Sequence, residues 1–196
     1  MMSGNHQINR SLFFRGIAME RIFDPFSDRL ARDIRNSLSS ALIAELTGDS
    51  EGAVAQTADQ WKRRDPSPVH RDYIRMTLDR YRQVSNEILS LEIRESRFQA
   101  VLLWNAGLFF ELHELLETVW HDARDTDRIA LKGFIQAAGA YVHSLRGKPQ
   151  AARGLAERAR GNLLAGSPAL GFIANLDDLI QGLREPSQPP PRLVLS

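Results

Sequence analysis

Apolar residues in this chain recur at steps of three and four positions instead of alternating with polar residues. That spacing places side chains on one face of an α-helix, whereas a half-buried strand needs a period of two. The first clear stripe ends at Gly48, and it consists of Leu30, Ile34, Leu38, Ala41, Leu42 and Leu46. Because no segment of useful length has the two-residue period, the sequence predicts an all-α protein.

Proline and glycine breaks divide the chain into helices with short connections. We expect the first helix to start at Asp24-Pro25, since aspartate caps helices and proline suits the first helical position. The further helices are expected over residues 51–63, 69–91, 97–104, 108–123, 128–146 and 150–164, and after Asn175. Short connections make neighbouring helices antiparallel, so the predicted fold is a helical bundle built from antiparallel helix hairpins.

Composition excludes several classes of protein. The chain has 196 residues and no cysteine, which removes disulfides, thiolate metal ligands and cysteine nucleophiles. Lys+Arg (25) and Asp+Glu (24) nearly balance, so the net charge of +1 favours neither nucleic acid nor a membrane surface as a partner. No apolar run approaches the roughly 20 residues that span a bilayer, and no signal peptide is evident. We therefore expect a cytoplasmic protein.

Most polar residues that could carry chemistry lie between Trp104 and His121. On a helical wheel, the apolar residues of this stretch share one arc, and His113 lies at its edge with Glu117 one turn further on. Glu114 and Glu111 point progressively outward, so we expect them on a solvated acidic face. His113 and Glu117 are thus predicted to form an i, i+4 pair at the core boundary. Such a pair is either a structural ion pair or part of a partly dry binding site.

The next helix is apolar or small nearly all round over residues 129–145, which predicts a central position in the bundle. Lys132, Gln136 and His143 nevertheless fall on one narrow stripe. A buried glutamine or histidine needs a partner, because an unpaired polar group in the interior costs about 1–3 kcal/mol. The polar face of the preceding helix is the nearest supply, so we expect the two stripes to pack together.

Two functions are consistent with this polar cluster. In the first, which we favour, the cluster fixes the bundle or binds a small polar ligand. In the second, His113, Glu117 and His143 bind a divalent metal, and Glu114 or Glu111 acts as general base of a hydrolase. The His-Glu-x-x-His motif of zinc proteases is not met, because position 117 is Glu. No Glu has a His three residues later, as di-iron bundles need.

The motif Asn105-Ala-Gly-x-Phe-Phe-Glu111-x-His113-Glu114-x-x-Glu117-x-x-Trp120 resembles the hallmark of the domain of unknown function 309 family. Gln136-Ala-Ala, His143, Gly147 and Asn162 also fit that family, so the likeness covers about residues 100–165. The resemblance implies a small all-α domain of unestablished role, in a family where some members are labelled predicted metal-dependent hydrolases. Leu112 departs from the family, in which alanine is usual. The candidate binding residues are Asn105, Glu111, His113, Glu114, Glu117, Trp120, Gln136 and His143.

The family-like helices lie within a longer chain. We expect four segments: a flexible N-terminal arm (1–23), a helical extension (24–95), a family-like helical domain (96–185) and a proline-rich tail (186–196). We expect the family-like domain to pack with the extension as one globular unit. Trp61, Trp104 and Phe110 either fill the bundle or cover the interface of a homo-oligomer. Residues 111–127 are acidic and residues 146–160 are basic, and we expect these two segments to pair with each other.

Overall fold

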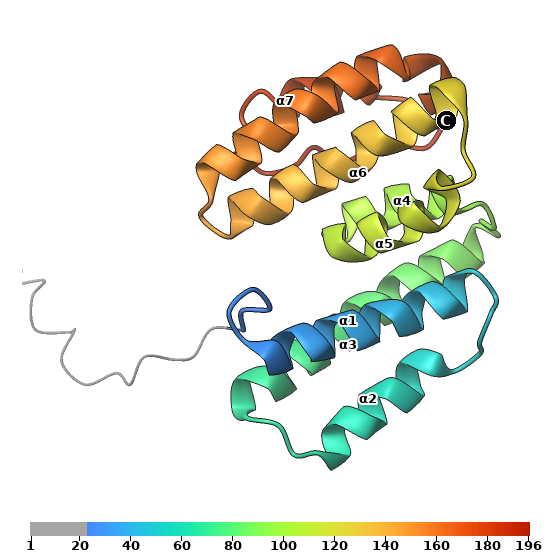
Figure 1. Cartoon of the computed structure of the whole chain (residues 1–196). Helices are drawn as coiled ribbons and strands as arrows, with labels where there is room; N and C mark the ends of the chain where they lie inside the picture. The colour runs from blue at the N-terminus through green and yellow to red at the C-terminus, as the bar shows by residue number, and fades with distance from the viewer. Residues whose placement is uncertain (1–22) are drawn as a thin grey trace, which may run out of the picture.

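The computed structural model describes residues 23–196, and this part of the chain is all-α, as predicted (Figure 1). Its only strand-like feature is an isolated bridge between Ile173 and Leu195. The predicted N-terminal arm lies outside the described residues except for Phe23. The elements are α1 (Arg29–Leu46), α2 (Ala53–Arg63), α3 (Pro68–Ser90), α4 (Ser96–Asn105), α5 (Phe109–Trp120), α6 (Asp125–Leu145), α7 (Pro149–Ala165), the 3₁₀ helix η1 (Ser167–Leu170) and α8 (Leu176–Gly182).

The first helix begins later than the sequence predicts. Asp28 is its N-cap, and the Asp28 carboxylate accepts hydrogen bonds from the backbone N–H groups of Leu30 (2.8 Å) and Ala31 (3.3 Å). Asp24 instead accepts bonds from the Phe26 N–H and the Ser27 hydroxyl, which close a turn before the helix. The expected start at Asp24-Pro25 is therefore wrong, because two aspartates compete for the capping role and the later one takes it.

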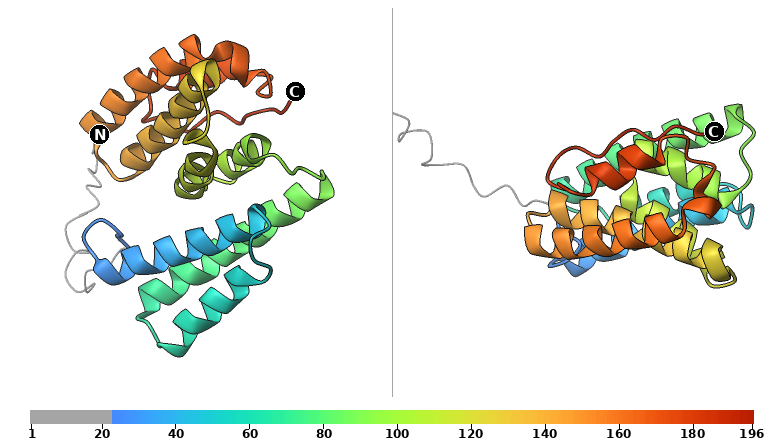
Figure 2. Two further views of the ribbon diagram at one scale, coloured as in Figure 1. Left: turned by 45° about the vertical axis from the view of Figure 1, so that its right-hand side comes forward. Right: turned by 90° about the horizontal axis from the view of Figure 1, so that it is seen from above.

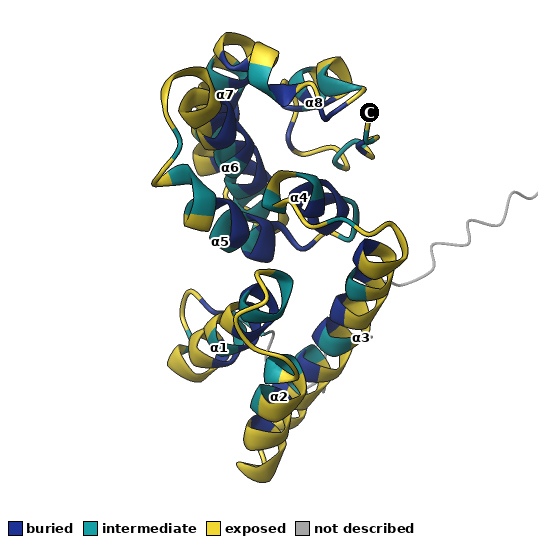
Figure 3. Ribbon diagram, turned by 90° about the vertical axis from the view of Figure 1, so that its right-hand side faces the viewer, coloured by how far each residue is buried: buried dark blue, intermediate teal, exposed yellow. Residues whose placement is uncertain are grey.

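The helices form three layers (Figure 1). The first contains α1, α2 and α3, the middle layer contains α4 and α5, and the third contains α6 and α7. Helices α6 and α7 make the most extensive contact, α5 packs on α6, and α1 connects the first layer to α5. Figure 3 shows α4 largely buried, whereas α2 and α3 expose their outer faces. None of the helices within residues 23–196 is long and apolar enough to cross a membrane.

One hydrophobic cluster runs through all three layers. Trp104, which is 2% exposed, lies near its centre and packs edge-on against Phe109 of α5 and Tyr141 of α6, at ring-centroid distances of 5.0 and 5.3 Å. Trp61 of α2 is also buried. These tryptophans therefore fill the bundle, and the buried residues of the extension are continuous with those of the later helices.

The C-terminal segment docks on α4. The Trp104 indole N–H donates to the Pro191 carbonyl (2.8 Å), and the Asn105 side chain exchanges two hydrogen bonds of 2.8 Å with the backbone of Leu193. The Leu193 side chain is 2% exposed. Figure 2 shows this segment, coloured dark red, crossing the molecule to its end near α4. The proline-rich tail is thus part of the packed structure.

Candidate functional site

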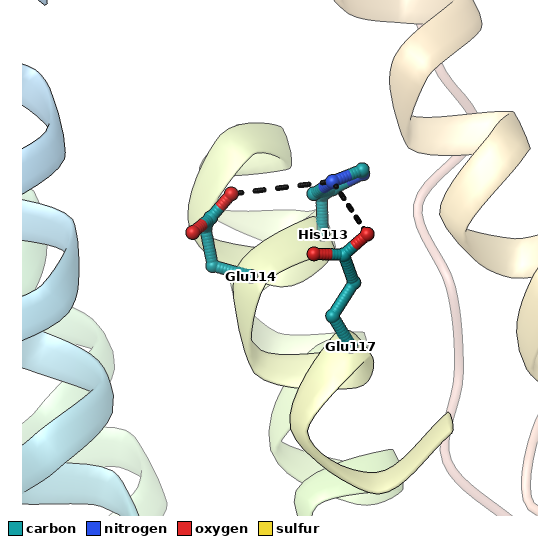
Figure 4. A group of neighbouring side chains, drawn as sticks. All are labelled: His113, Glu114 and Glu117. Atoms are coloured by element: carbon teal, nitrogen blue, oxygen red, sulfur yellow. Dashed lines mark ion pairs between the residues drawn. The ribbon is translucent and has the colours of Figure 1, made fainter. Parts of the chain in front are cut away.

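Helix α5 positions a cluster of one histidine and two glutamates. The chain turns from α4 into α5 at Gly107, whose φ of 70° suits a residue without a side chain. Glu117 follows His113 by four residues and Glu114 by three, so it is a helical neighbour of both, and all three side chains reach toward one another (Figure 4). The His113 Nε2 atom lies 3.3 Å from the Glu117 carboxylate and 4.0 Å from the Glu114 carboxylate. We call these three residues the α5 cluster.

The donor chemistry of the α5 cluster suits two kinds of contact. Its ligand atoms, one imidazole nitrogen and two carboxylate oxygens, all lie within 4.8 Å of one another. The His113–Glu117 separation of 3.3 Å matches the spacing of about 3.3 Å between two ligands of a tetrahedral ion at about 2.0–2.1 Å. It also suits an i, i+4 ion pair on a helix surface. The side chains are 37%, 37% and 47% exposed, so solvent reaches all of them.

Glu111 does not lie on a solvated face. It is 4% exposed, and the Tyr81 hydroxyl of α3 donates a hydrogen bond of 2.6 Å to its carboxylate. The expected outward position of Glu111 is therefore wrong. The helical wheel of α5 has one apolar arc, which predicts that only one face of the helix is buried. In the structure, α5 is covered by α6 on one side and by the N-terminal helices on the other.

Burial sets the electrostatics around Glu111. It raises the pKa of the Glu111 carboxyl, while the Tyr81 hydrogen bond and the positive charge of Arg35 act in the opposite direction. Burial and the Glu111 charge also raise the pKa of Tyr81 well above its usual range. Desolvation, reinforced by the same carboxylate, raises the pKa of Tyr73 to about 12. Arg35 stacks its guanidinium over the Phe110 ring at 3.8 Å, and burial lowers the pKa of Arg35.

Sequence reasoning missed Arg35, Tyr73 and Tyr81 as neighbours of Glu111. All three belong to the extension, and both tyrosines belong to the apolar stripe of α3. The available signal was that a tyrosine hydroxyl inside a bundle needs a hydrogen-bond partner. A carboxylate is one such partner, but nothing in the sequence says which one lies opposite.

Three other predicted site residues tie segments together. Asn105 binds the C-terminal segment, as described above. The Trp120 indole donates to the Arg128 carbonyl (3.1 Å), and the Arg128 guanidinium covers the Trp120 ring at 4.2 Å. Gln136 accepts a hydrogen bond of 2.7 Å from Asn162 of α7. Gln136 therefore takes its partner from α7 rather than from the polar face of α5.

His143 is separate from the α5 cluster. Among residues 23–196, the potential metal ligands that lie close together are His113, Glu114 and Glu117. The third donor beside His113 and Glu117 is therefore Glu114, whereas the sequence suggested His143. The His143 ring lies 6.2 Å from the Phe26 ring, between centroids. Its Nδ1 atom is buried and has no hydrogen-bond partner in the described part of the chain.

The expected pairing between the acidic and basic segments is wrong. Over the residues that the structure describes, no ion pair joins residues 111–127 to residues 146–160. Arg146 instead pairs with Asp24 at 2.5 Å, and Glu114 and Glu117 face His113. The physical reason is the layer order, because α6 lies between the acidic helix α5 and the basic helix α7.

The fold and the site together define an all-helical protein with a His/Glu cluster on a central helix. Residues 98–155 match the family model described as Domain of unknown function (DUF309). This match confirms the resemblance seen in the motif, and it spans the α5 cluster, Gln136 and His143. No curated protein and no solved structure matches the chain. Helices α1, α2 and α3, including Tyr81, lie outside the matched span.

Proposed function

We propose that this chain is a ligand-binding helical domain, and that the α5 cluster binds a small cation, in the simplest case a divalent metal ion. The observation that carries the proposal is the gathering of three donor atoms from His113, Glu114 and Glu117 within 4.8 Å of one another. One imidazole and two carboxylates form a donor set that zinc, manganese and iron accept.

Charge and access support the same proposal. Within residues 23–196, the ion pairs of Glu114 and Glu117 are those with His113, so no lysine or arginine neutralises them at ion-pair distance. The two carboxylates therefore have one histidine, and no lysine or arginine, as their ion-pair partner. Because the side chains are 37–47% exposed, an ion can reach them without any unfolding of the bundle.

Binding is better supported than metal-dependent hydrolysis. The hydrolase alternative uses His113, Glu117 and His143 as ligands, whereas His143 packs beside Phe26 and outside the gathered donors. One of its two candidate bases, Glu111, is buried and hydrogen-bonded to Tyr81. We also propose that the protein is cytoplasmic and that its partner is a small polar ligand rather than nucleic acid. The net charge of +1 supports the proposal that nucleic acid is not the partner.

Calorimetric titration of the full chain, purified without a histidine tag, tests the proposal with Zn²⁺ and Mn²⁺ as probes. We expect one ion per chain, and we expect His113→Ala and Glu117→Gln each to weaken binding by about tenfold or more. The matched control is His121→Ala, since His121 is an exposed histidine just after the same helix. Binding that is absent, or equally strong in His113→Ala and His121→Ala, would overturn the proposal.

Thermal unfolding separates binding from a purely structural role. An ion that binds the folded chain at 100 times its Kd stabilises it by about 2.7 kcal/mol. We expect a rise of Tm with metal in the wild type and in His121→Ala, and none in His113→Ala. If His113→Ala lowers Tm by the same amount with and without metal, and the wild type shows no response, the α5 cluster is a structural ion pair and the proposal fails.

A further inference from the structure

A cavity of about 380 Å³ opens beside the end of α5, and none of the predicted site residues is among those that line it. Its size falls within the range of about 300–1,000 Å³ that small-molecule sites occupy. The floor is apolar and is supplied by α5, α6 and the segment around η1, through Val119, Ala130, Leu131, Ala169 and Phe172. The charged lining residues are Arg94, Glu95 and Arg97 at the start of α4 and Asp127 of α6.

The charged lining residues are only partly paired with each other. The Arg97 Nε atom lies 3.1 Å from the Glu95 carboxylate. Arg94 and Asp127 take part in none of the ion pairs found within residues 23–196. The cavity lining therefore contains one cation and one anion without an ion-pair partner, together with apolar side chains.

A second, more open cavity of about 600 Å³ is also lined by Asp127. It shares Ala123, Asp127 and Ala169 with the first cavity, so the two adjoin. Its lining adds Asp122 and Asp125, against Arg124 as the basic residue. The charged residues that line the second cavity are therefore mostly acidic, and Asp127 belongs to both linings.

We infer that this cavity binds a small zwitterion with an apolar body, of the kind represented by an apolar amino acid. The apolar body covers Leu131 and Phe172, where each square ångström removed from water contributes about 25 cal/mol. The ligand carboxylate pairs with Arg94, whose planar guanidinium suits a two-bond contact. The ligand ammonium pairs with Asp127. A molecule that lacks one charge makes one of these two contacts only, so the cavity favours a ligand that carries both charges.

Titration of the full chain with L-phenylalanine, 3-phenylpropionate and 2-phenylethylamine tests the inference. The three probes share a phenyl ring, and the second and third each lack one charge. We expect phenylalanine to bind about two- to fivefold more tightly than either analogue, because each analogue lacks one contact between exposed charges. Binding is followed by calorimetry and by NMR shifts of the alanines in the floor.

Variants assign the two charges. Arg94→Ala should weaken binding of phenylalanine and 3-phenylpropionate and leave that of 2-phenylethylamine unchanged, whereas Asp127→Asn should show the reverse selectivity between the analogues. Both residues are exposed, so neither change disturbs the core. Matched controls are Arg63→Ala on α2 and Asp177→Asn on α8, two exposed positions outside both cavities.

Two outcomes would overturn the inference. One is that phenylalanine causes no heat change and no NMR shifts at millimolar concentration. The other is that 3-phenylpropionate or 2-phenylethylamine binds as tightly as phenylalanine, which would mean that one of the two charges is not recognised. Because the α5 cluster takes no part in lining either cavity, the result does not depend on the metal titration.

Discussion

The phenol of Tyr81 donates a hydrogen bond of 2.6 Å to the carboxylate of Glu111, and both side chains are almost completely buried. Tyr81 belongs to α3, which precedes the DUF309 match, whereas Glu111 belongs to α5 within that match. Helix α3 therefore covers an acidic side chain of the matched segment and supplies the hydrogen-bond donor that this buried carboxylate needs.

Replacement of Tyr81 by phenylalanine should destabilise the fold. Tyr81→Phe leaves the Glu111 carboxylate buried without this donor, which costs about 1–3 kcal/mol. The free energy of unfolding is measured by urea denaturation. Tyr141→Phe is the matched control, because the Tyr141 hydroxyl is buried without a hydrogen-bond partner among residues 23–196 and its removal should be neutral or stabilising. Equal losses in the two variants would contradict the role assigned to Tyr81.

Glu111 should make stability fall as the pH rises. Burial raises the pKa of Glu111 in the folded chain above its ordinary value of 4.5. Between 4.5 and that raised pKa, the folded state binds more protons than the unfolded state, so its stability decreases with increasing pH and levels off above the raised pKa. Glu111→Gln lacks this contribution. The unfolding free energy of wild type minus that of Glu111→Gln should therefore fall from pH 4.5 upward, as measured by denaturation at several pH values.

The Tyr81 hydrogen bond sharpens this pH test. Since that bond lowers the pKa of Glu111, its removal in Tyr81→Phe should extend the pH range over which stability falls. A difference between wild type and Glu111→Gln that is independent of pH would show that the carboxyl titrates as it does in the unfolded chain.

Loss of Asn105 should release the C-terminal segment. Asn105→Ala removes both hydrogen bonds to Leu193 and leaves two partly buried backbone groups unpaired, at a cost of about 1–3 kcal/mol. Thermal unfolding reports the loss, and limited proteolysis should cleave residues 186–196 faster. Asn86→Ala is the control, since Asn86 is exposed on α3. If both variants keep the wild-type Tm and cleavage rate, the segment is not held by Asn105.

Alanine at Gly133 should separate α6 from α7. A Cβ there would lie 2.8 Å from the Leu163 backbone nitrogen, a contact that backbone atoms cannot easily relieve. We expect Gly133→Ala to cost about 1–3 kcal/mol in spite of the better helix propensity of alanine. Gly139→Ala on the same helix would meet only the flexible end of Leu155 at 3.4 Å. That variant should be neutral or more stable by up to about 1 kcal/mol in urea denaturation, and a similar loss at both positions would contradict the tight contact.

Features that depend on neighbours along one helix could be predicted from the sequence. The three- and four-residue spacing predicted the helices, and the i, i+4 spacing predicted the contact between His113 and Glu117. The DUF309 resemblance rested on the same short stretch. Each of these follows from the geometry of a single helix, which is the same wherever that helix lies in the fold.

Features that depend on which helix covers which face were decided only by the tertiary structure. Glu111 reads as an exposed acid until α3 places Tyr81 over it, and Gln136 takes its partner from α7 rather than from α5. The cavity beside Arg94 and Asp127 likewise forms from segments far apart in the chain. A helical wheel gives the direction of a side chain from its own axis but not the element that lies opposite. That element is set by long-range packing of the whole core, in which the extension takes part.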